Sequence, residues 1–99
     1  MRIISGTYRG RPLASLGKGD AAAHLRPTSD RVRESLFSML THHDVIEGAR
    51  VLDLFAGTGA LGLEALSRGA REVCFIENGR TGQRLIAENI ETLRAGDHC

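Results

Sequence analysis

The sequence predicts an α/β fold in which parallel strands alternate with helices. Apolar runs at 50–55 and 72–77 are nearly continuous, as expected of strands that helices cover on both faces of a sheet. Helical patterns at 59–68 and about 80–94 follow these two runs. Since strand, helix, strand and helix alternate along the chain, they specify a right-handed parallel βαβ unit.

The N-terminal segment has a hairpin-like pattern. Residues 2–5 and 11–13 are short extended candidates that glycines punctuate, so we expect a small β-hairpin there. Residues 14–25 are rich in Gly, Ala and Ser and are expected to form a loop. Residues 1–25 are therefore grouped as a basic N-terminal hairpin and loop.

A helix is predicted next, within a segment at 26–47 that leads into the sheet. Its start signal is Pro27-Thr-Ser-Asp30. Four apolar residues then recur at i, i+4, i+7 and i+8 and define one buried stripe: Val32, Leu36, Met39 and Leu40. This spacing places Leu36 and Met39 in the core, and it leaves three charged residues off the stripe: Arg31, Arg33 and Glu34.

Residues 48–99 hold the βαβ unit itself. Its first helix is followed by Gly69, a residue type suited to the left-handed position after a helix. In the second strand we interpret Cys74 as a small core residue. The last helix presents Ile86, Ile90 and Leu93 at i, i+4 and i+7, which is the spacing of one apolar face.

The composition is that of an ordinary globular chain, with 41% hydrophobic and 25% charged residues. The net charge of +1 is unevenly spread, because residues 1–43 hold seven Lys/Arg and three Asp/Glu. This basic front fits either nucleic-acid contact or a solvated surface. No signal peptide and no apolar run of about 20 residues is visible, so we expect a cytoplasmic protein without a membrane segment. The four histidines show no ligand spacing, and we expect no metal site.

A glycine-rich turn follows the first strand, and two acidic residues are expected beside it. Gly57 and Gly59 allow backbone amides to approach a ligand closely. Asp53 lies near the carboxyl end of the first strand, and Glu77 lies at the carboxyl end of the next. Adjacent strand ends are roughly 5 Å apart in a parallel sheet, so Glu77 is well placed for a ribose over the turn. A carboxylate accepts the two hydrogen bonds that a ribose diol donates.

The residues leave two kinds of cofactor open. Gly57-x-Gly59-x-x-Gly62 matches the dinucleotide fingerprint, which would favour NAD or FAD with a pyrophosphate on the helix N-terminus. S-adenosylmethionine has no phosphate and carries positive charge, and Asp53 suits its ammonium group better than a pyrophosphate. The balance favours S-adenosylmethionine. A structural role for Asp53, as an acceptor for loop amides, also stays open.

Three segments carry a family resemblance. Residues 53–70 (DLFAGTGALGLEALSRGA) resemble motif I of class I S-adenosylmethionine-dependent methyltransferases, which have a Rossmann-like fold. Residues 26–40 (RPTSDRVRESLFSML) and 1–11 (MRIISGTYRGR) resemble one branch of that class. The branch is the bacterial small-subunit (16S) ribosomal RNA guanine-N2 methyltransferases of the RsmD type. The resemblance covers almost the whole chain and implies the N-terminal part of that fold, with its first two βα units.

The resemblance implies S-adenosylmethionine as cofactor and 16S ribosomal RNA, or a small-subunit assembly intermediate, as partner of a protein that is monomeric at full length. The glycine turn would hold the methionine part, Glu77 the ribose hydroxyls, and Asp53 the amino acid end. The full set of implied cofactor residues is Asp53, Phe55, Ala56, Gly57, Thr58, Gly59, Glu77 and Asn78, with Arg26 and Thr28 near the cofactor mouth. The candidate RNA contacts are Arg2, Arg9, Arg11, Lys18, Arg31 and Arg33, although exposed helix charge is the other interpretation of Arg31 and Arg33.

The sequence departs from the family in one large respect. These enzymes carry an Asn/Asp-Pro-Pro-Tyr/Phe motif that binds the target amino group, whereas the only prolines here are Pro12 and Pro27. We therefore assign no catalytic residue and expect residues 48–99 to form the first half of a cofactor domain that is inactive alone. Methylation of another nucleic-acid amine, such as adenine N6, and a non-catalytic truncated fragment remain alternatives. Asn78 and Gly79 also depart from the family pattern and are expected to loosen the adenosine pocket.

Overall fold

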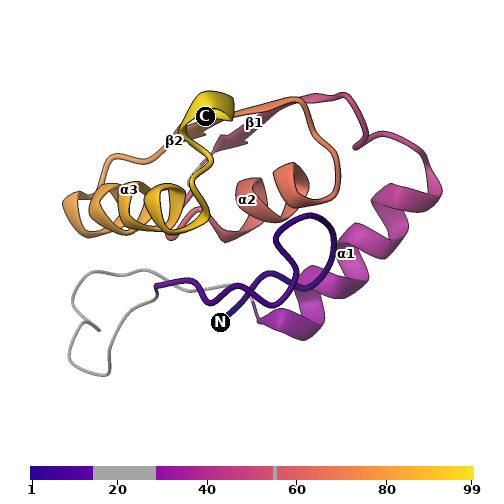
Figure 1. The fold of residues 1–99 in the computed structure, drawn as a ribbon, viewed down its shortest axis with the longest axis horizontal. Helices are drawn as coiled ribbons and strands as arrows, with labels where there is room; N and C mark the ends of the chain where they lie inside the picture. Colours follow the sequence, from indigo (N-terminus) through magenta and orange to yellow (C-terminus); the bar gives the residue numbers. More distant parts are fainter. Residues whose placement is uncertain (15–28, 55) are drawn as a thin grey trace.

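The computed structural model describes residues 1–14, 29–54 and 56–99 of the chain. Figure 1 shows its elements in the order α1 (Asp30–His42), β1 (Arg50–Leu54), α2 (Ala60–Ser67), β2 (Glu72–Ile76), α3 (Arg80–Leu93) and the 3-10 turn η2 (Gly96–His98). The two strands are parallel, with Arg50 opposite Glu72 and Leu54 opposite Ile76. The predicted α/β order and the parallel βαβ unit are confirmed.

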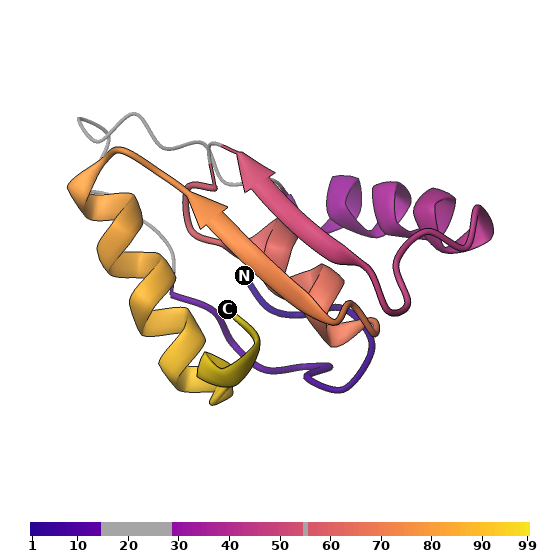
Figure 2. The same ribbon diagram turned by 90° about the horizontal axis from the view of Figure 1, so that it is seen from above.

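The helices lie on one face of the two-stranded sheet. Figures 1 and 2 together show α2 beneath both strands and α3 beside it, below β2. A Cβ added to Gly62 would lie 2.4 Å from Cε1 of Phe75 and 2.7 Å from Cγ1 of Val73, so this glycine allows α2 to rest directly on β2. The core between these layers is made of buried side chains from the N-terminal segment, α2, β2 and α3, among them Ile3, Leu13, Leu63, Leu66, Val73 and Leu93.

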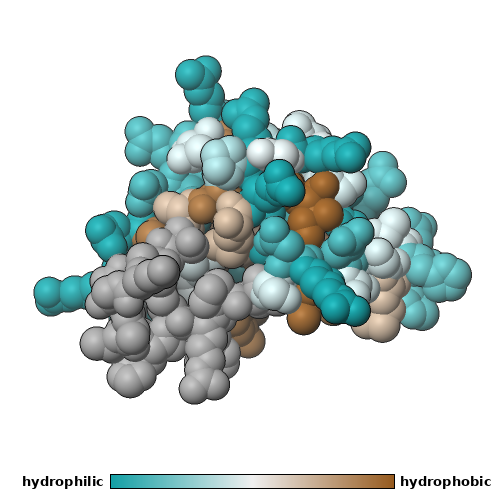
Figure 3. All heavy atoms as spheres, turned by 90° about the horizontal axis from the view of Figure 1, so that it is seen from below, coloured by the Kyte–Doolittle hydropathy of each residue, from teal (hydrophilic) through white to brown (hydrophobic). Residues whose placement is uncertain are grey.

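The opposite face of the sheet corrects the expectation that helices cover both faces. Leu52, Leu54 and Ile76 are 60%, 57% and 49% exposed, and Cys74, expected in the core, is exposed beside them. Because side chains alternate along a strand, these residues all point away from α2. Figure 3, which shows the molecule from below, presents mainly hydrophilic side chains around small apolar areas outside its grey atoms. The sheet face that points away from α2 thus exposes a group of apolar side chains.

The N-terminal segment doubles back on itself, but it pairs through a single antiparallel bridge, between Arg2 and Pro12, rather than through two full strands. Backbone hydrogen bonds from Ile3 to Arg11 (3.0 Å) and from Leu13 to Met1 (2.9 Å) hold its two arms together. The buried side chains of Ile3 and Leu13 join the core. Figure 1 shows this segment below α2, so it forms an outer layer over that helix.

Helix α1 buries a different face from the one that its apolar spacing predicts. The side chain of Ser29 accepts a hydrogen bond from the N–H of Val32, so the predicted start signal is confirmed within one turn. The residues that α1 buries are Arg33 and Phe37, whereas Val32 and Met39 are 56% and 54% exposed. Phe37 packs against Ile46, Ala65 and Ala70, and this contact sets the rotation of the helix.

Candidate functional site

The glycine turn connects β1 to α2 at the carboxyl end of the sheet. Gly57 and Gly59 have φ values of 59° and 83°, the left-handed conformation that glycine adopts without strain. The N–H of Gly59 donates to the carbonyl of Ala56 at 2.8 Å and closes the turn. Ala56 in turn donates to the carbonyl of Ile76 at 2.9 Å, which attaches the turn to the end of β2. The predicted placement of a tight turn at a strand end is confirmed.

Glu77 follows β2 and reaches directly across to this turn. Its Oε1 atom accepts the N–H of Gly57 at 2.8 Å, and its Oε2 atom accepts the N–H of Gly79 at 2.9 Å. Each carboxylate oxygen has a second lone pair, so the group can accept further hydrogen bonds while it keeps both of these. The carboxylate thus joins the turns after β1 and β2, as the spacing of parallel strand ends predicts.

Two residues of α3 that were not predicted from the sequence determine the position of Glu77: Gly82 leaves room for its side chain, and Gln83 binds its backbone. A Cβ on Gly82 would lie 2.7 Å from Cγ of Glu77 and 3.0 Å from the carbonyl oxygen of Gly57. The Gln83 side-chain amide donates to the carbonyl of Glu77 at 2.7 Å. A glycine inside a helical pattern costs about 1 kcal/mol relative to alanine, and this cost was the available signal that Gly82 serves close packing.

Asp53 is buried beneath the turn and binds the start of α2. Its Oδ2 atom accepts the N–H of Gly62 at 3.0 Å, so the structural role left open for this residue is present. Burial raises the pKa of the Asp53 carboxyl above its ordinary value, the bond from Gly62 opposes that rise, and the nearby Glu77 charge adds to it. Among the ion pairs within the described residues, none includes Asp53 or Glu77. A positively charged ligand at this turn would therefore meet two carboxylates that form no ion pair with the described cationic residues.

The remaining predicted cofactor residues divide into three groups. Ala56 and Thr58 belong to the turn, and the carbonyl of Thr58 accepts a hydrogen bond from the buried side chain of Asn89 at 2.9 Å. Asn78 is exposed immediately after Glu77. Phe55, Arg26 and Thr28 lie outside the described residues.

The candidate RNA contacts separate clearly by exposure. Arg2, Arg9 and Arg11 are exposed on the N-terminal segment, and Arg31 is exposed on α1. Lys18 lies outside the described residues. Arg2 and Arg9 line a hollow of about 330 Å³ together with two acidic residues of α1, Asp30 and Glu34.

Arg33 corrects the sequence-based expectation, because its side chain is fully buried. Its guanidinium binds the carboxylates of Asp30, at 2.7 Å, and Glu64, at 3.4 Å, and donates to the carbonyl of Arg2. A phosphate at the surface has no access to such a group. Arg33 therefore belongs to the framework beneath the N-terminal segment rather than to an RNA-binding surface.

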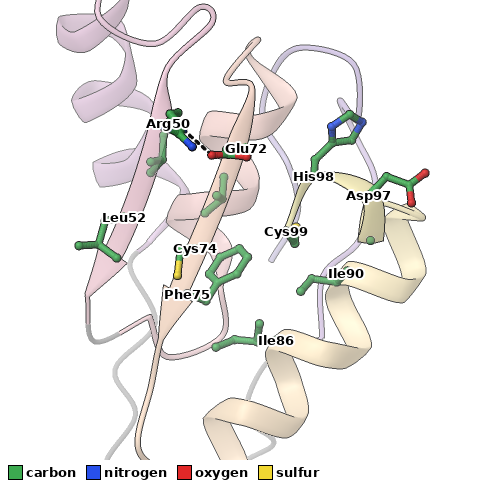
Figure 4. Close-up of a pocket in the computed structure, with 13 residues that line it drawn as sticks. Arg50, Leu52, Glu72, Cys74, Phe75, Ile86, Ile90, Asp97, His98 and Cys99 are labelled. Atoms are coloured by element: carbon green, nitrogen blue, oxygen red, sulfur yellow. Dashed lines mark hydrogen bonds and ion pairs between the residues drawn. The ribbon is translucent and has the colours of Figure 1, made fainter.

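A pocket of about 880 Å³ lies beside the glycine turn, because two of its lining residues, Phe75 and Ile86, are close to Gly59. Figure 4 shows it between the strands and the C-terminal residues, with the Arg50–Glu72 ion pair at one end. It is lined chiefly by apolar side chains of β2 and α3, such as Phe75, Ile86 and Ile90, and by the C-terminal residues 96–99. None of the predicted cofactor residues that the structure describes lines it.

Two further classes of site are absent from the part of the chain that the structure describes. There, no three His, Cys, Asp or Glu side chains are grouped closely enough to hold a metal ion. None of the described helices has the length and apolar character needed to cross a membrane.

Comparison with known proteins places the chain in a family. The family model described as Conserved hypothetical protein 95 matches residues 1–99. The chain is 48% identical over 97 residues to Ribosomal RNA small subunit methyltransferase D of Escherichia coli K12, covering 98% of this chain and 46% of that protein. It is 45% identical over 94 residues to the protein of the same name from Haemophilus influenzae, covering 95% and 46%.

Solved structures agree with these sequence relationships. The structure of yhhF from Escherichia coli matches with a TM-score of 0.79 and 49% identity, over 97% of this chain and 49% of that one. A hypothetical protein of Thermus thermophilus matches with a TM-score of 0.78 and 36% identity, over 95% and 50%. The chain spans about half the length of the curated relatives that it matches. It belongs to the Conserved hypothetical protein 95 family of methyltransferases, and it corresponds to the N-terminal part of its relatives.

Proposed function

We propose that this chain carries the S-adenosylmethionine-binding half of an enzyme that methylates the N2 amino group of a guanine in 16S ribosomal RNA. The observation that carries the proposal is the convergence of Glu77 and Asp53 on the turn at Gly57–Gly59. The relatives named Ribosomal RNA small subunit methyltransferase D support the reaction and the RNA class.

The cofactor's chemistry suits the charges at this turn. A ribose diol donates hydrogen bonds. The Glu77 carboxylate accepts the N–H groups of Gly57 and Gly79 and still has lone pairs that can accept the two ribose hydroxyls. The Asp53 carboxyl lies in the same region and would orient the ammonium group of the amino acid end. A pyrophosphate would face the same two carboxylates at close range, so the charge pattern disfavours a dinucleotide.

The role of the chain in methyl transfer is positioning. Bound at the turn, S-adenosylmethionine would supply a methyl group from its sulfonium sulfur to an amine nitrogen held in line with it, which would leave S-adenosylhomocysteine and release one proton of the amine to water. The described residues at the turn bind and orient the donor. We propose that residues of the complete protein, of the Asn/Asp-Pro-Pro-Tyr/Phe type, hold the acceptor amine, and that the 99-residue chain alone binds the cofactor without transferring the methyl group.

Exposed arginines on the N-terminal segment and α1 would hold the RNA backbone. The set is Arg2, Arg9, Arg11 and Arg31. Each contact with a phosphate releases counterions, so binding through this set would weaken as the salt concentration rises.

The proposal is tested by calorimetric titration of the chain with S-adenosylhomocysteine. Glu77→Gln replaces one accepting oxygen by a donating amide that faces a backbone N–H, so we expect the affinity to fall about tenfold, or about 1.4 kcal/mol. Glu72→Gln is the matched control, because Glu72 is an exposed carboxylate at the opposite end of the same strand. Binding that is absent in the wild-type chain, or equal in Glu77→Gln and wild type, would overturn the assignment.

A further inference from the structure

Asn89 of α3 is a fully buried polar residue, and both polar atoms of its side chain form hydrogen bonds. Its Oδ1 atom accepts the N–H of Ala14 at 2.6 Å. Its Nδ2 atom donates to the carbonyl of Ala14 at 3.1 Å and to the carbonyl of Thr58 at 2.9 Å. One carboxamide therefore joins α3, the N-terminal segment and the glycine turn.

The three partners demand this side chain. Two carbonyls need two donors, and one N–H needs an acceptor, at the end of a short side chain. A carboxamide offers this combination, whereas a carboxylate has no donor and a hydroxyl has one. Because the site is buried, any replacement leaves backbone polar groups without a partner, which is costly in the interior.

The contact with Thr58 acts on a peptide unit of the turn that precedes a glycine with positive φ. The Thr58 carbonyl and the Gly59 N–H belong to one peptide plane, and Asn89 holds one side of it while Ala56 holds the other. Gly59 has a φ of 83°, and glycine populates positive and negative φ about equally. Glycine by itself therefore leaves this peptide able to rotate, and the buried Asn89 amide together with the Ala56 carbonyl selects one orientation.

We propose that Asn89 is a positioning residue for the cofactor turn, and that it makes the conformation of that turn depend on the docking of residues 1–14. The proposal rests on the proposed function only for its consequence for cofactor affinity. The coupling itself is a property of the fold. Since coupling between two sites is reciprocal, cofactor binding at the turn would also strengthen the docking of Ala14.

Amide hydrogen exchange tests the coupling without any ligand. Asn89→Leu keeps a side chain of similar size and removes the hydrogen-bonding amide. In this variant we expect hydrogen exchange at the amides of Ala14 and Gly59 to accelerate at least tenfold. Thr7, which donates to Ser67, and Leu63, which donates to Gly59, report on docking and on α2 independently of Asn89. The exchange rates of the Thr7 and Leu63 amides should stay within about threefold of their wild-type values. An equal acceleration at all four amides would show a merely structural role and would overturn the proposal.

Ala14→Pro tests the other end of the contact without altering Asn89 or the turn. It removes the N–H that donates to Oδ1 and leaves the two carbonyl contacts in place. We expect exchange at Gly59 to accelerate about threefold, so this variant decides the matter if Asn89→Leu does not fold. Glu88→Gln alters an exposed residue beside Asn89 on α3 and is the control. It should leave the exchange rates of the Ala14 and Gly59 amides unchanged.

Titration with S-adenosylhomocysteine adds a functional measurement. We expect Asn89→Leu or Ala14→Pro to bind it at least threefold more weakly, and we expect the ligand to slow exchange at Ala14 in the wild-type chain. Unchanged affinity in both variants, with wild-type binding intact, would overturn the positioning role. If the wild-type chain binds no ligand, the proposed function fails, and the exchange at Gly59 in the free protein still decides the coupling.

Discussion

Arg33 and Glu64 form a fully buried ion pair between α1 and α2, with 3.4 Å between Nε of the arginine and Oε1 of the glutamate. The same carboxylate accepts the N–H groups of Ile4 and Ser5 and the side chain of Arg68. One buried anion therefore holds two helices and the N-terminal segment together. Both charges depend on this network, because an unpaired charge in the interior is strongly unfavourable.

Removing that anion should destabilise the whole chain. We expect Glu64→Ala to lower the free energy of unfolding by about 3–5 kcal/mol, the range measured when one partner of a buried pair is lost. Urea unfolding followed by circular dichroism measures the change. Glu72→Ala is the control, because the Arg50–Glu72 pair is exposed and should contribute little. Equal midpoints for wild type and Glu64→Ala would show that the network does not stabilise the fold.

Asp53 predicts a pH dependence with a definite sign. Its pKa in the folded chain is raised above the ordinary value of 3.8, so the folded state binds more protons above that pH than the unfolded state does. The contribution of Asp53 to stability therefore decreases as the pH rises from 3.8 through the folded-state pKa.

Asp53→Asn removes the pH-dependent contribution of this carboxyl to stability, because the amide carries no charge. Its side-chain oxygen can still accept the N–H of Gly62. We expect the stability of the variant relative to wild type to increase with pH across that window, measured by urea unfolding at a series of pH values. Asp97→Asn, at an exposed carboxylate of η2, should show no such trend. A difference between Asp53→Asn and wild type that stays constant with pH would contradict the buried, raised-pKa description.

Gly82→Ala separates helix propensity from the geometry of the site. Alanine is favoured over glycine inside a helix by about 1 kcal/mol. Here the added Cβ would meet the side chain of Glu77 at 2.7 Å, so the carboxylate must move from its contacts with Gly57 and Gly79. We expect weaker binding of S-adenosylhomocysteine, by about three- to tenfold, or roughly 0.7–1.4 kcal/mol.

Gly96→Ala is the matched control for that substitution, because a Cβ at Gly96 would meet no atom within 4 Å. It should leave ligand affinity unchanged. Full affinity in Gly82→Ala would mean that the position of Glu77 does not govern binding.

The bare face of the sheet predicts self-association. Leu52, Leu54 and Ile76 lie together on strands with unpaired outer edges in the described structure, and exposed apolar edges promote pairing between chains. We expect the 99-residue chain to associate at micromolar concentrations and Leu52→Lys to reduce this, as measured by analytical ultracentrifugation. Val32→Lys changes an equally exposed residue of α1 and should have little effect. A monomeric wild-type chain would contradict the prediction.

Much of the candidate site was predictable from the sequence because it follows from local patterns. The apolar runs of β1 and β2, the glycines between β1 and α2, and the acidic residues at the two strand ends each have a recognisable spacing. Parallel pairing then requires neighbouring strand ends to meet, so Glu77 and the turn at Gly57 come together without further information. The face that α1 buries was not predictable in this way, because it is set by contacts with α2: Phe37 packs against Ala65, and Arg33 pairs with Glu64.

The sequence by itself determined the order of the elements and the chemistry gathered at the carboxyl ends of the strands, because short-range patterns encode both. The tertiary structure alone decided that Arg33 is buried, that Gly82 makes room for Glu77, and that Asn89 joins Ala14, 75 residues away, to the glycine turn. These contacts depend on which surfaces meet when the chain folds. The local sequence around a residue does not indicate which residue it will contact at such a distance along the chain.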